Sequence, residues 1–195
     1  MKQLKLFEDD NTEEKQDKQE ENEGFDWAKE FPKCCDENGN FEGFDVVIGN
    51  PPYIGVRTSQ IPKIHSDFYK ENYETATGQF DIFALFIELS YKILNNSGFH
   101  AFIVPKRMAT NENFETLRTF LMEKLGLFQF ADAQMPFHAA GVEANIVFTQ
   151  KDKLFDTIKN HLLEPKKVKF INSIETETIH QLPFKIFPFF INNPG

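Results

Sequence analysis

The sequence has few cysteines and no long hydrophobic run. Its two cysteines, Cys34 and Cys35, are adjacent, and neighbouring cysteines rarely form a disulfide with each other. We therefore expect free thiols, as in a protein of the reducing cytoplasm. No apolar stretch approaches the roughly 20 residues that a membrane-spanning helix needs, so no membrane partner is expected. The histidines show no metal-ligand spacing, which argues against a metal site.

Basic residues are outnumbered by acidic ones, and the net charge is −9. Such a balance is unfavourable for nucleic acid binding. The excess is unevenly distributed, because residues 1–24 hold nine acidic residues and four lysines with almost no apolar content. That composition is typical of a disordered tail. A basic surface would therefore have to come from local patches in the remaining chain.

Apolar patterns predict an α/β fold after this tail. Short continuous apolar runs at residues 44–49, 99–104, 127–132 and 144–149 indicate buried strands, the first of them covered on both faces as in a parallel sheet. Helical periodicity covers residues 80–94, which NNSG at 95–98 should end, and 113–125, which Gly126 should end. Residues 54–79 are expected to form a long irregular loop, and residues 166–171 are a weaker strand candidate.

The order of these elements is strand, loop, helix, strand, helix, strand, strand. It matches the second half of a doubly wound α/β sheet. The short connection between the last two strands permits an antiparallel pair at the sheet edge. In such sheets, ligands bind beyond the carboxyl ends of the strands.

The sequence GNPPY follows the first predicted strand directly, which places Asn50 at such an end. Pro51 and Pro52 fix the backbone and withhold two N–H donors, so the backbone offers carbonyl oxygens. With the Asn50 side-chain oxygen, it presents two fixed acceptors that suit an –NH2 group, and Tyr53 adds an aromatic face. The segment thus describes a clamp for a planar amine such as adenine, and it would stabilise the positive charge that forms when the amine attacks a methyl donor. The alternative is a structural Pro-Pro turn with Tyr53 in the core.

Three segments of the chain resemble a known enzyme family. FDVVIGNPPYIGV resembles the catalytic motif of gamma-class adenine-specific (N6) DNA methyltransferases, and it is followed by GQFDIFALFIELSYKILNNSGFHAFIVPKRM and MPFHAAGVEANIVF in the family's order. The likeness is strongest to the methylase part of type IIG restriction-modification enzymes. It implies the catalytic half of a Rossmann-like methyltransferase sheet, a restriction-modification role, double-stranded DNA as partner and S-adenosylmethionine as methyl donor.

The resemblance also implies residue roles. Asn50 and Pro51 would accept hydrogen bonds from adenine N6, with Pro52 and Tyr53 completing the catalytic motif. Tyr53 would stack on an extruded target base, and Phe137 would stack on its other face, although Phe137 could equally belong to the core.

Other residues have weaker functional patterns. Phe86 matches an aromatic residue of the S-adenosylmethionine pocket, but it also lies on the apolar stripe of its helix. Two basic groups could contact phosphate or be solvated surface charges: Lys106 with Arg107, and Lys166 with Lys167 and Lys169.

A Gly-rich turn for the methyl donor, with a ribose-binding acid, is missing before residue 44. We therefore expect an incomplete sheet and three parts: a disordered acidic tail at 1–24, the catalytic half at 25–153, and the start of a linker or target-recognition region at 154–195. The isolated chain should be inactive, with a second chain or segment supplying the donor-binding half. The alternatives are a related enzyme that methylates RNA or a protein glutamine, and a non-catalytic remnant or binding module.

Overall fold

The computed structural model describes residues 25–55, 61–137 and 141–188, the side chain of Phe137 excepted. The chain divides into two units, residues 1–42 and 43–195. The predicted tail at 1–24 lies outside the described residues. The described part of the first unit holds the short helices α1 (Trp27–Glu30) and η1 (Pro32–Cys34). The Trp27 ring contacts those of Phe25 and Phe31 at centroid distances of 4.7 and 5.8 Å.

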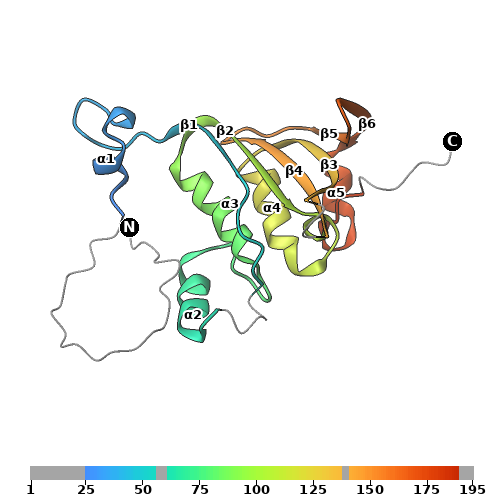
Figure 1. Ribbon diagram of the computed structural model, residues 1–195, viewed down its shortest axis with the longest axis horizontal. Coiled ribbons are helices and arrows are strands. Elements are labelled where there is room, and N and C mark those ends of the chain that lie inside the picture. Colours follow the sequence, from blue (N-terminus) through green and yellow to red (C-terminus); the bar gives the residue numbers. More distant parts are fainter. Residues whose placement is uncertain (1–24, 56–60, 138–140, 189–195) are drawn as a thin grey trace. The chain divides into compact units, whose positions relative to one another are not determined.

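The second unit contains one six-stranded mixed sheet (Figure 1). Its strands lie in the order β1-β2-β4-β3-β5-β6. The parallel pairs are β1 with β2 and β3 with β5, whereas β4 is antiparallel to both of its neighbours and β6 is antiparallel to β5. Consequently β1, β2, β3 and β5 end at the same edge of the sheet. The strand bounds are β1 Phe44–Gly49, β2 Leu94–Pro105, β3 Leu127–Phe137, β4 Val142–Gln150, β5 Thr157–Glu164 and β6 Lys167–Glu175.

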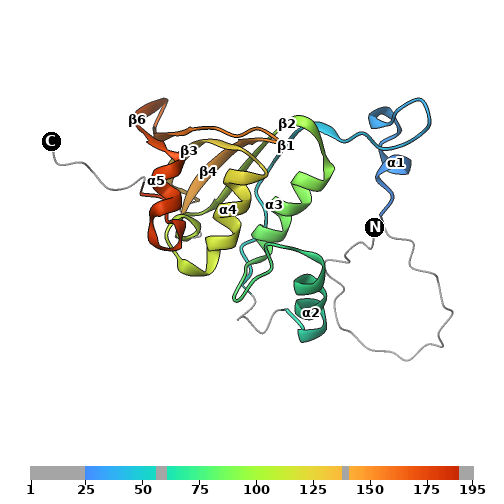
Figure 2. The same ribbon diagram turned by 180° about the vertical axis from the view of Figure 1, so that it is seen from behind.

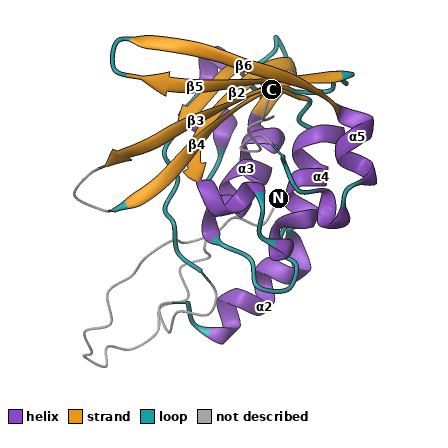
Figure 3. Cartoon of the chain, turned by 90° about the vertical axis from the view of Figure 1, so that its right-hand side faces the viewer, coloured by secondary structure: helices purple, strands orange, loops and turns teal. Residues whose placement is uncertain are grey.

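Helices α3, α4 and α5 pack on one face of this sheet (Figures 2 and 3). Between the helices and the sheet lies a cluster of buried apolar side chains, in which Phe83 and Ile87 of α3 meet Leu121 of α4 and Phe130 of β3. Burying a side chain of this size contributes roughly 1.5–3 kcal/mol. The helices are α2 Lys63–Asn72, α3 Ile82–Ile93, α4 Glu115–Glu123 and α5 Thr176–Gln181, with 3-10 turns η2 Lys106–Ala109, η3 Glu112–Phe114 and η5 Pro183–Lys185.

The four predicted strands and both predicted helices are confirmed. Three other predictions are corrected, which concern a loop, the end of a helix and the place of one strand pair in the sheet. The expected loop at 54–79 contains α2, whose only buried residues are Ser66 and Tyr69, so its apolar period is too weak to detect. The helix predicted to end at NNSG ends at Ile93, and the NNSG residues already belong to β2. The β3–β4 pair does not lie at the sheet edge, because β4 also pairs with β2 and β3 with β5.

The region after residue 153 continues the same sheet. The weak strand candidate at 166–171 is β6. Strand β5 was not predicted, because its polar residues Lys159, Asn160 and His161 interrupt the apolar pattern. Gly126, at a φ of 61°, follows α4, and a Cβ there would lie 2.1 Å from the Lys153 carbonyl oxygen. Only glycine therefore fits this turn.

The first strand, β1, was expected to be covered on both faces, and within the described residues this is wrong. Its side chains Val46 and Ile48 are 55% and 74% exposed. The helices cover the other face of the sheet (Figure 3), and β1 pairs only with β2 in the described part of the chain. Among the residues that the structure describes, the strand therefore has one unpaired edge and one open apolar face.

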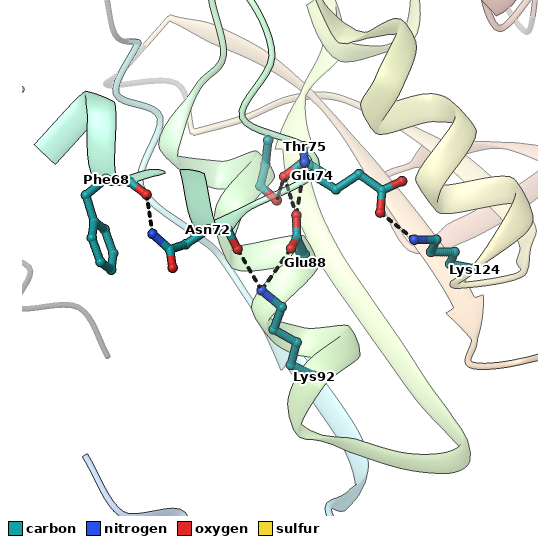
Figure 4. Close-up of polar contacts among 8 residues, drawn as sticks. Phe68, Asn72, Glu74, Thr75, Glu88, Lys92 and Lys124 are labelled. Carbon is teal, nitrogen blue, oxygen red and sulfur yellow. Dashed lines mark hydrogen bonds and ion pairs between the residues drawn. The ribbon is translucent and has the colours of Figure 1, made fainter. Parts of the chain in front are cut away.

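A buried carboxylate holds the segment between α2 and α3 against the helix layer (Figure 4). Glu88, 4% exposed, accepts hydrogen bonds from the backbone N–H and the hydroxyl of Thr75 at 3.0 and 3.1 Å. Its other oxygen lies 2.8 Å from Lys92 Nζ, which also donates to the Asn72 carbonyl at 3.3 Å. Because every oxygen of this carboxylate is satisfied, the end of α2 is fixed to α3.

Candidate functional site at the carboxyl end of β1

The NPPY segment (residues 50–53) begins immediately after Gly49, the last residue of β1. Asn50 is exposed, Pro51 is buried, and Pro52 and Tyr53 are half-buried. Within the described part of the chain, the Asn50 amide makes no hydrogen bond. Asn50 and Pro51 thus lie on a backbone that two consecutive prolines constrain.

Tyr53 is held in one orientation by two contacts. Its hydroxyl donates to the carbonyl oxygen of Ile103 in β2 at 3.0 Å, and its ring meets that of Phe83 edge-on at a centroid distance of 6.2 Å. Burial raises the pKa of the Tyr53 phenol, so the hydroxyl remains a donor at neutral pH. A fixed aromatic ring of this kind can stack on a planar ligand without losing much side-chain entropy.

A pocket of about 410 Å³ lies beside Tyr53, within the range of small-ligand sites. Its walls come from three segments that meet at the shared edge of the sheet. Tyr53 follows β1, residues 105–107 end β2 and begin η2, and residues 141–143 precede and begin β4. The lining residues are Tyr53, Pro105, Lys106, Arg107, Gly141, Val142 and Glu143.

The two basic residues of this pocket are both ion-paired. Lys106 Nζ lies 3.2 Å from Asp132 Oδ2 and 3.8 Å from Glu143 Oε1. Arg107 forms an ion pair with Asp81. Lys106 and Arg107 were expected either to contact phosphate or to be solvated surface charges. In this structure both are paired with carboxylates that line or adjoin the pocket.

Asp81 pairs with Arg107 of the pocket wall and was not predicted from the sequence. It is 3% exposed and precedes α3. The backbone of Asp81 forms an isolated antiparallel bridge with that of Gly55. The N–H of Ile82 donates to the Ile54 carbonyl at 2.9 Å. Burial raises the pKa of the Asp81 carboxyl, against the opposing effect of Arg107. The one available sequence signal was a lone acid inside the apolar stretch QFDIFALF, which usually marks only a helix cap.

The two further aromatic candidates are placed differently. Phe137 ends β3 and its backbone is paired with Val142, which lines the pocket; its side chain lies outside the described residues. Phe86 belongs to α3, is half-buried, and packs against the core cluster. It is not among the residues that line the Tyr53 pocket. The structure thus groups Tyr53 with the start of β4 and leaves Phe86 in the helix layer.

Two other kinds of site are not found among the described residues. No three His, Cys, Asp or Glu side chains lie close enough to hold a metal ion there. No described helix is both long and apolar enough to cross a membrane.

Comparison with solved structures gives the fold. The chain superimposes on the type IIG restriction endonuclease BpuSI with a TM-score of 0.57 at 19% identity, over 69% of this chain and 19% of that one. It also matches a protein of Listeria monocytogenes assigned to the class I S-adenosylmethionine-dependent methyltransferases, with a TM-score of 0.51 at 19% identity, over 63% of this chain and 37% of that one. The six-stranded sheet is therefore part of a Rossmann-like methyltransferase fold.

Comparison of sequences gives the family. The chain is 41% identical over 81 residues to the type II restriction enzyme and methyltransferase RM.Eco57I of Escherichia coli, which is 41% of this chain but 8% of that protein. Residues 1–136, more than half of the chain, match the sequence model of the family described as Eco57I restriction-modification methylase. The chain therefore belongs to the Eco57I restriction-modification methylase family.

Proposed function

We propose that this chain carries the target-base half of a site-specific DNA methyltransferase that methylates N6 of adenine within a restriction-modification system. One observation supports this above the others: the exposed Asn50 begins a segment whose two prolines constrain the backbone, and Tyr53 at the end of that segment lines a pocket. The family membership and the methyltransferase fold are consistent with this chemistry.

The residues of the segment would act on the exocyclic amine of the target base. Asn50 Oδ1 and the Pro51 carbonyl accept its two N–H bonds, which orients the nitrogen lone pair and stabilises positive charge on that nitrogen. Tyr53 stacks on one face of the base and Phe137 on the other. Because N6 inside a DNA duplex is not accessible, the base would enter the pocket extruded from the stack.

The methyl donor in this proposal is S-adenosylmethionine, and the described residues do not complete a site for it. No Gly-rich turn between a strand and a helix occurs among them, and Phe86, the one candidate for its adenine pocket, packs on the core. The free edge of β1 is the place where further strands could join the sheet. We therefore assign the donor-binding half to another chain or segment of the complete enzyme.

The function is tested with Asn50→Ala in the assembled enzyme. Single-turnover methylation of duplex DNA should fall by a factor on the order of 10² or more, as for the loss of one preorganised hydrogen-bond partner. DNA affinity should be nearly unchanged. Asn72→Ala is the matched control, because Asn72 is also exposed and its side-chain amide donates to the Phe68 carbonyl within the same helix.

Three results would contradict the proposal. Methylation by Asn50→Ala within a few-fold of the parent would eliminate the clamp. A methylated product other than N6-methyladenine would exclude adenine as the substrate. A preference for RNA or for a protein glutamine, with DNA unmodified, would assign the pocket to a different planar amine or amide.

A further inference from the structure

The turn of the β5–β6 hairpin is a basic part of an otherwise acidic chain. Residues 157–170 contain four lysines and one acid, Glu164, whereas the whole chain carries a net charge of −9. Glu164 and Lys167 close a two-residue turn of Pro165 and Lys166. Lys166 has a φ of 68°, so proline followed by a residue at positive φ fixes the turn.

Most of this positive charge is available to a partner. Lys166, Lys167 and Lys169 are exposed. Lys167 Nζ lies 2.8 Å from Glu164 Oε2, but neither Lys166 nor Lys169 forms an ion pair within the described parts of the chain. The hydrogen bond from Lys167, with the charge of Lys169, holds the pKa of the Glu164 carboxyl below its usual range. The Glu164 carboxylate is thus ionised, and its charge is balanced by that of Lys167. The turn therefore keeps a net charge equal to that of the two other lysines, Lys166 and Lys169.

The hairpin turn lies at the edge of the sheet that carries the NPPY segment. Since β5 runs parallel to β3, and β3 runs in the same direction as β1, the carboxyl end of β5 is at that edge. Figure 3 shows the β5–β6 turn and the β3–β4 hairpin extending to the same side. The order of strands places β5 four steps from β1.

A second hollow lies between the Tyr53 pocket and the β5–β6 turn. It has a volume of about 690 Å³ and runs from Ile103 of β2 and Lys106 of η2 to Leu163, Glu164 and Pro165 at the turn. Lys106 and Glu143 line both this hollow and the Tyr53 pocket. The positive charge of Lys106 in this hollow is balanced by the carboxylates of Asp132 and Glu143, with which Lys106 forms ion pairs.

We propose that the β5–β6 hairpin binds the phosphate backbone of duplex DNA, through Lys166 and Lys169, at a distance from the target base. This inference rests on DNA being the substrate. Strands about 4.8 Å apart, with the twist of the sheet, put the turn on the order of 20–30 Å from Asn50. At about 3.4 Å per base pair, the contacted phosphates lie roughly six to nine base pairs from the methylated adenine.

The test is the salt dependence of binding to a fluorescent 30-base-pair duplex by anisotropy, with the full chain at 50–200 mM KCl. The slope of log K against log[salt] is negative, and each lost phosphate contact makes it less steep by about 0.9. Lys166→Gln with Lys169→Gln should therefore make it less steep by about 1.8. The control is Lys153→Gln with Lys159→Gln, which removes the same charge from exposed lysines nearer the amino end of β5. That control should keep the parent slope, and Lys166→Arg with Lys169→Arg should restore it.

Several outcomes would overturn the proposal: an unchanged slope for the hairpin variant, an equal loss in the control, no duplex binding by the parent at 50 mM KCl, or binding to phosphatidylserine vesicles in place of DNA. A hairpin-dependent slope together with normal methylation by Asn50→Ala would retain the hairpin contact and reject the proposed clamp. An unchanged slope for the hairpin variant, together with impaired methylation by Asn50→Ala, would retain the clamp and reject the hairpin contact.

Discussion

The hydroxyl of Tyr53 donates to the backbone carbonyl of Ile103 at 3.0 Å, which joins the NPPY segment to the neighbouring strand β2. Tyr53 therefore has two separable parts. The hydroxyl positions the ring, and the ring lines the pocket.

Tyr53→Phe and Tyr53→Ala should distinguish these parts in the complete enzyme. Tyr53→Phe removes one hydrogen bond and should lower the free energy of unfolding by about 1 kcal/mol, with base capture retained. Tyr53→Ala also removes the stacking surface and should weaken capture of the extruded base by about 1–3 kcal/mol. The fluorescence change of 2-aminopurine at the target position measures capture, and equal signals from both variants would contradict a stacking role.

Phe137→Ala should reduce the same 2-aminopurine signal, because the backbone of Phe137 pairs with Val142 at the wall of the pocket. Phe128→Ala is a control on the same strand, since the Phe128 ring packs against Phe155 at 5.4 Å. A full signal from Phe137→Ala would place Phe137 among the packing residues.

Isothermal titration of the purified chain with S-adenosylmethionine should show no measurable binding. The physical reason is that the described residues lack a Gly-rich turn and leave the edge of β1 free. A one-to-one curve with a micromolar dissociation constant would show that the donor site is complete in this chain.

Glu88→Ala should destabilise the fold by about 3 kcal/mol, since it leaves the Thr75 N–H and Lys92 without a buried partner. Hydrogen exchange should increase over residues 63–76. Glu71→Ala, an exposed change on α2, should alter stability by no more than about 0.5 kcal/mol. Equal effects of the two variants would argue against the Glu88 contacts as the anchor of α2.

His100 should make stability sensitive to acid. Burial lowers the pKa of His100 to about 3, Nδ1 lies 3.1 Å from the Thr149 hydroxyl, and Nε2 has no hydrogen-bond partner within the described residues. The unfolded chain binds a proton near its ordinary pKa of about 6.5, so stability is fully present above that pH. It is lost as pH falls toward 3, by about 2 kcal/mol between pH 7.5 and pH 5.

His100→Gln tests this dependence because it removes the titrating group. Urea unfolding at the two pH values should show a pH-dependent loss that is smaller by about 2 kcal/mol in the variant than in the parent. The same loss in both proteins would mean that other groups cause it.

Sequence patterns predicted the strands and helices whose apolar residues form continuous runs or clear periods, such as β1, α3 and β2. They did not predict α2, which buries two residues, or β5, which alternates with polar side chains. The insertion of β4 between β2 and β3 depends on pairing across the sheet, which local patterns do not record.

The same limit applies to the site. The NPPY segment could be located from its residues alone, because proline constrains the backbone locally. The ion pair of Asp81 with Arg107 joins residues 26 positions apart, and no spacing rule connects them. The roles of Asn50, Pro51, Pro52, Tyr53, Phe86 and Phe137 remain predictions.

The position of β4 also constrains how the chain folds during synthesis. Since β4 lies between β2 and β3, β2 has no neighbour on that side until Gln150 has left the ribosome, and β3 emerges before the strand that joins it to the sheet. Non-local pairing of this kind slows folding. Nascent chains released before Gln150 should therefore remain protease-sensitive, whereas those released after β4 gain a protected sheet in one step.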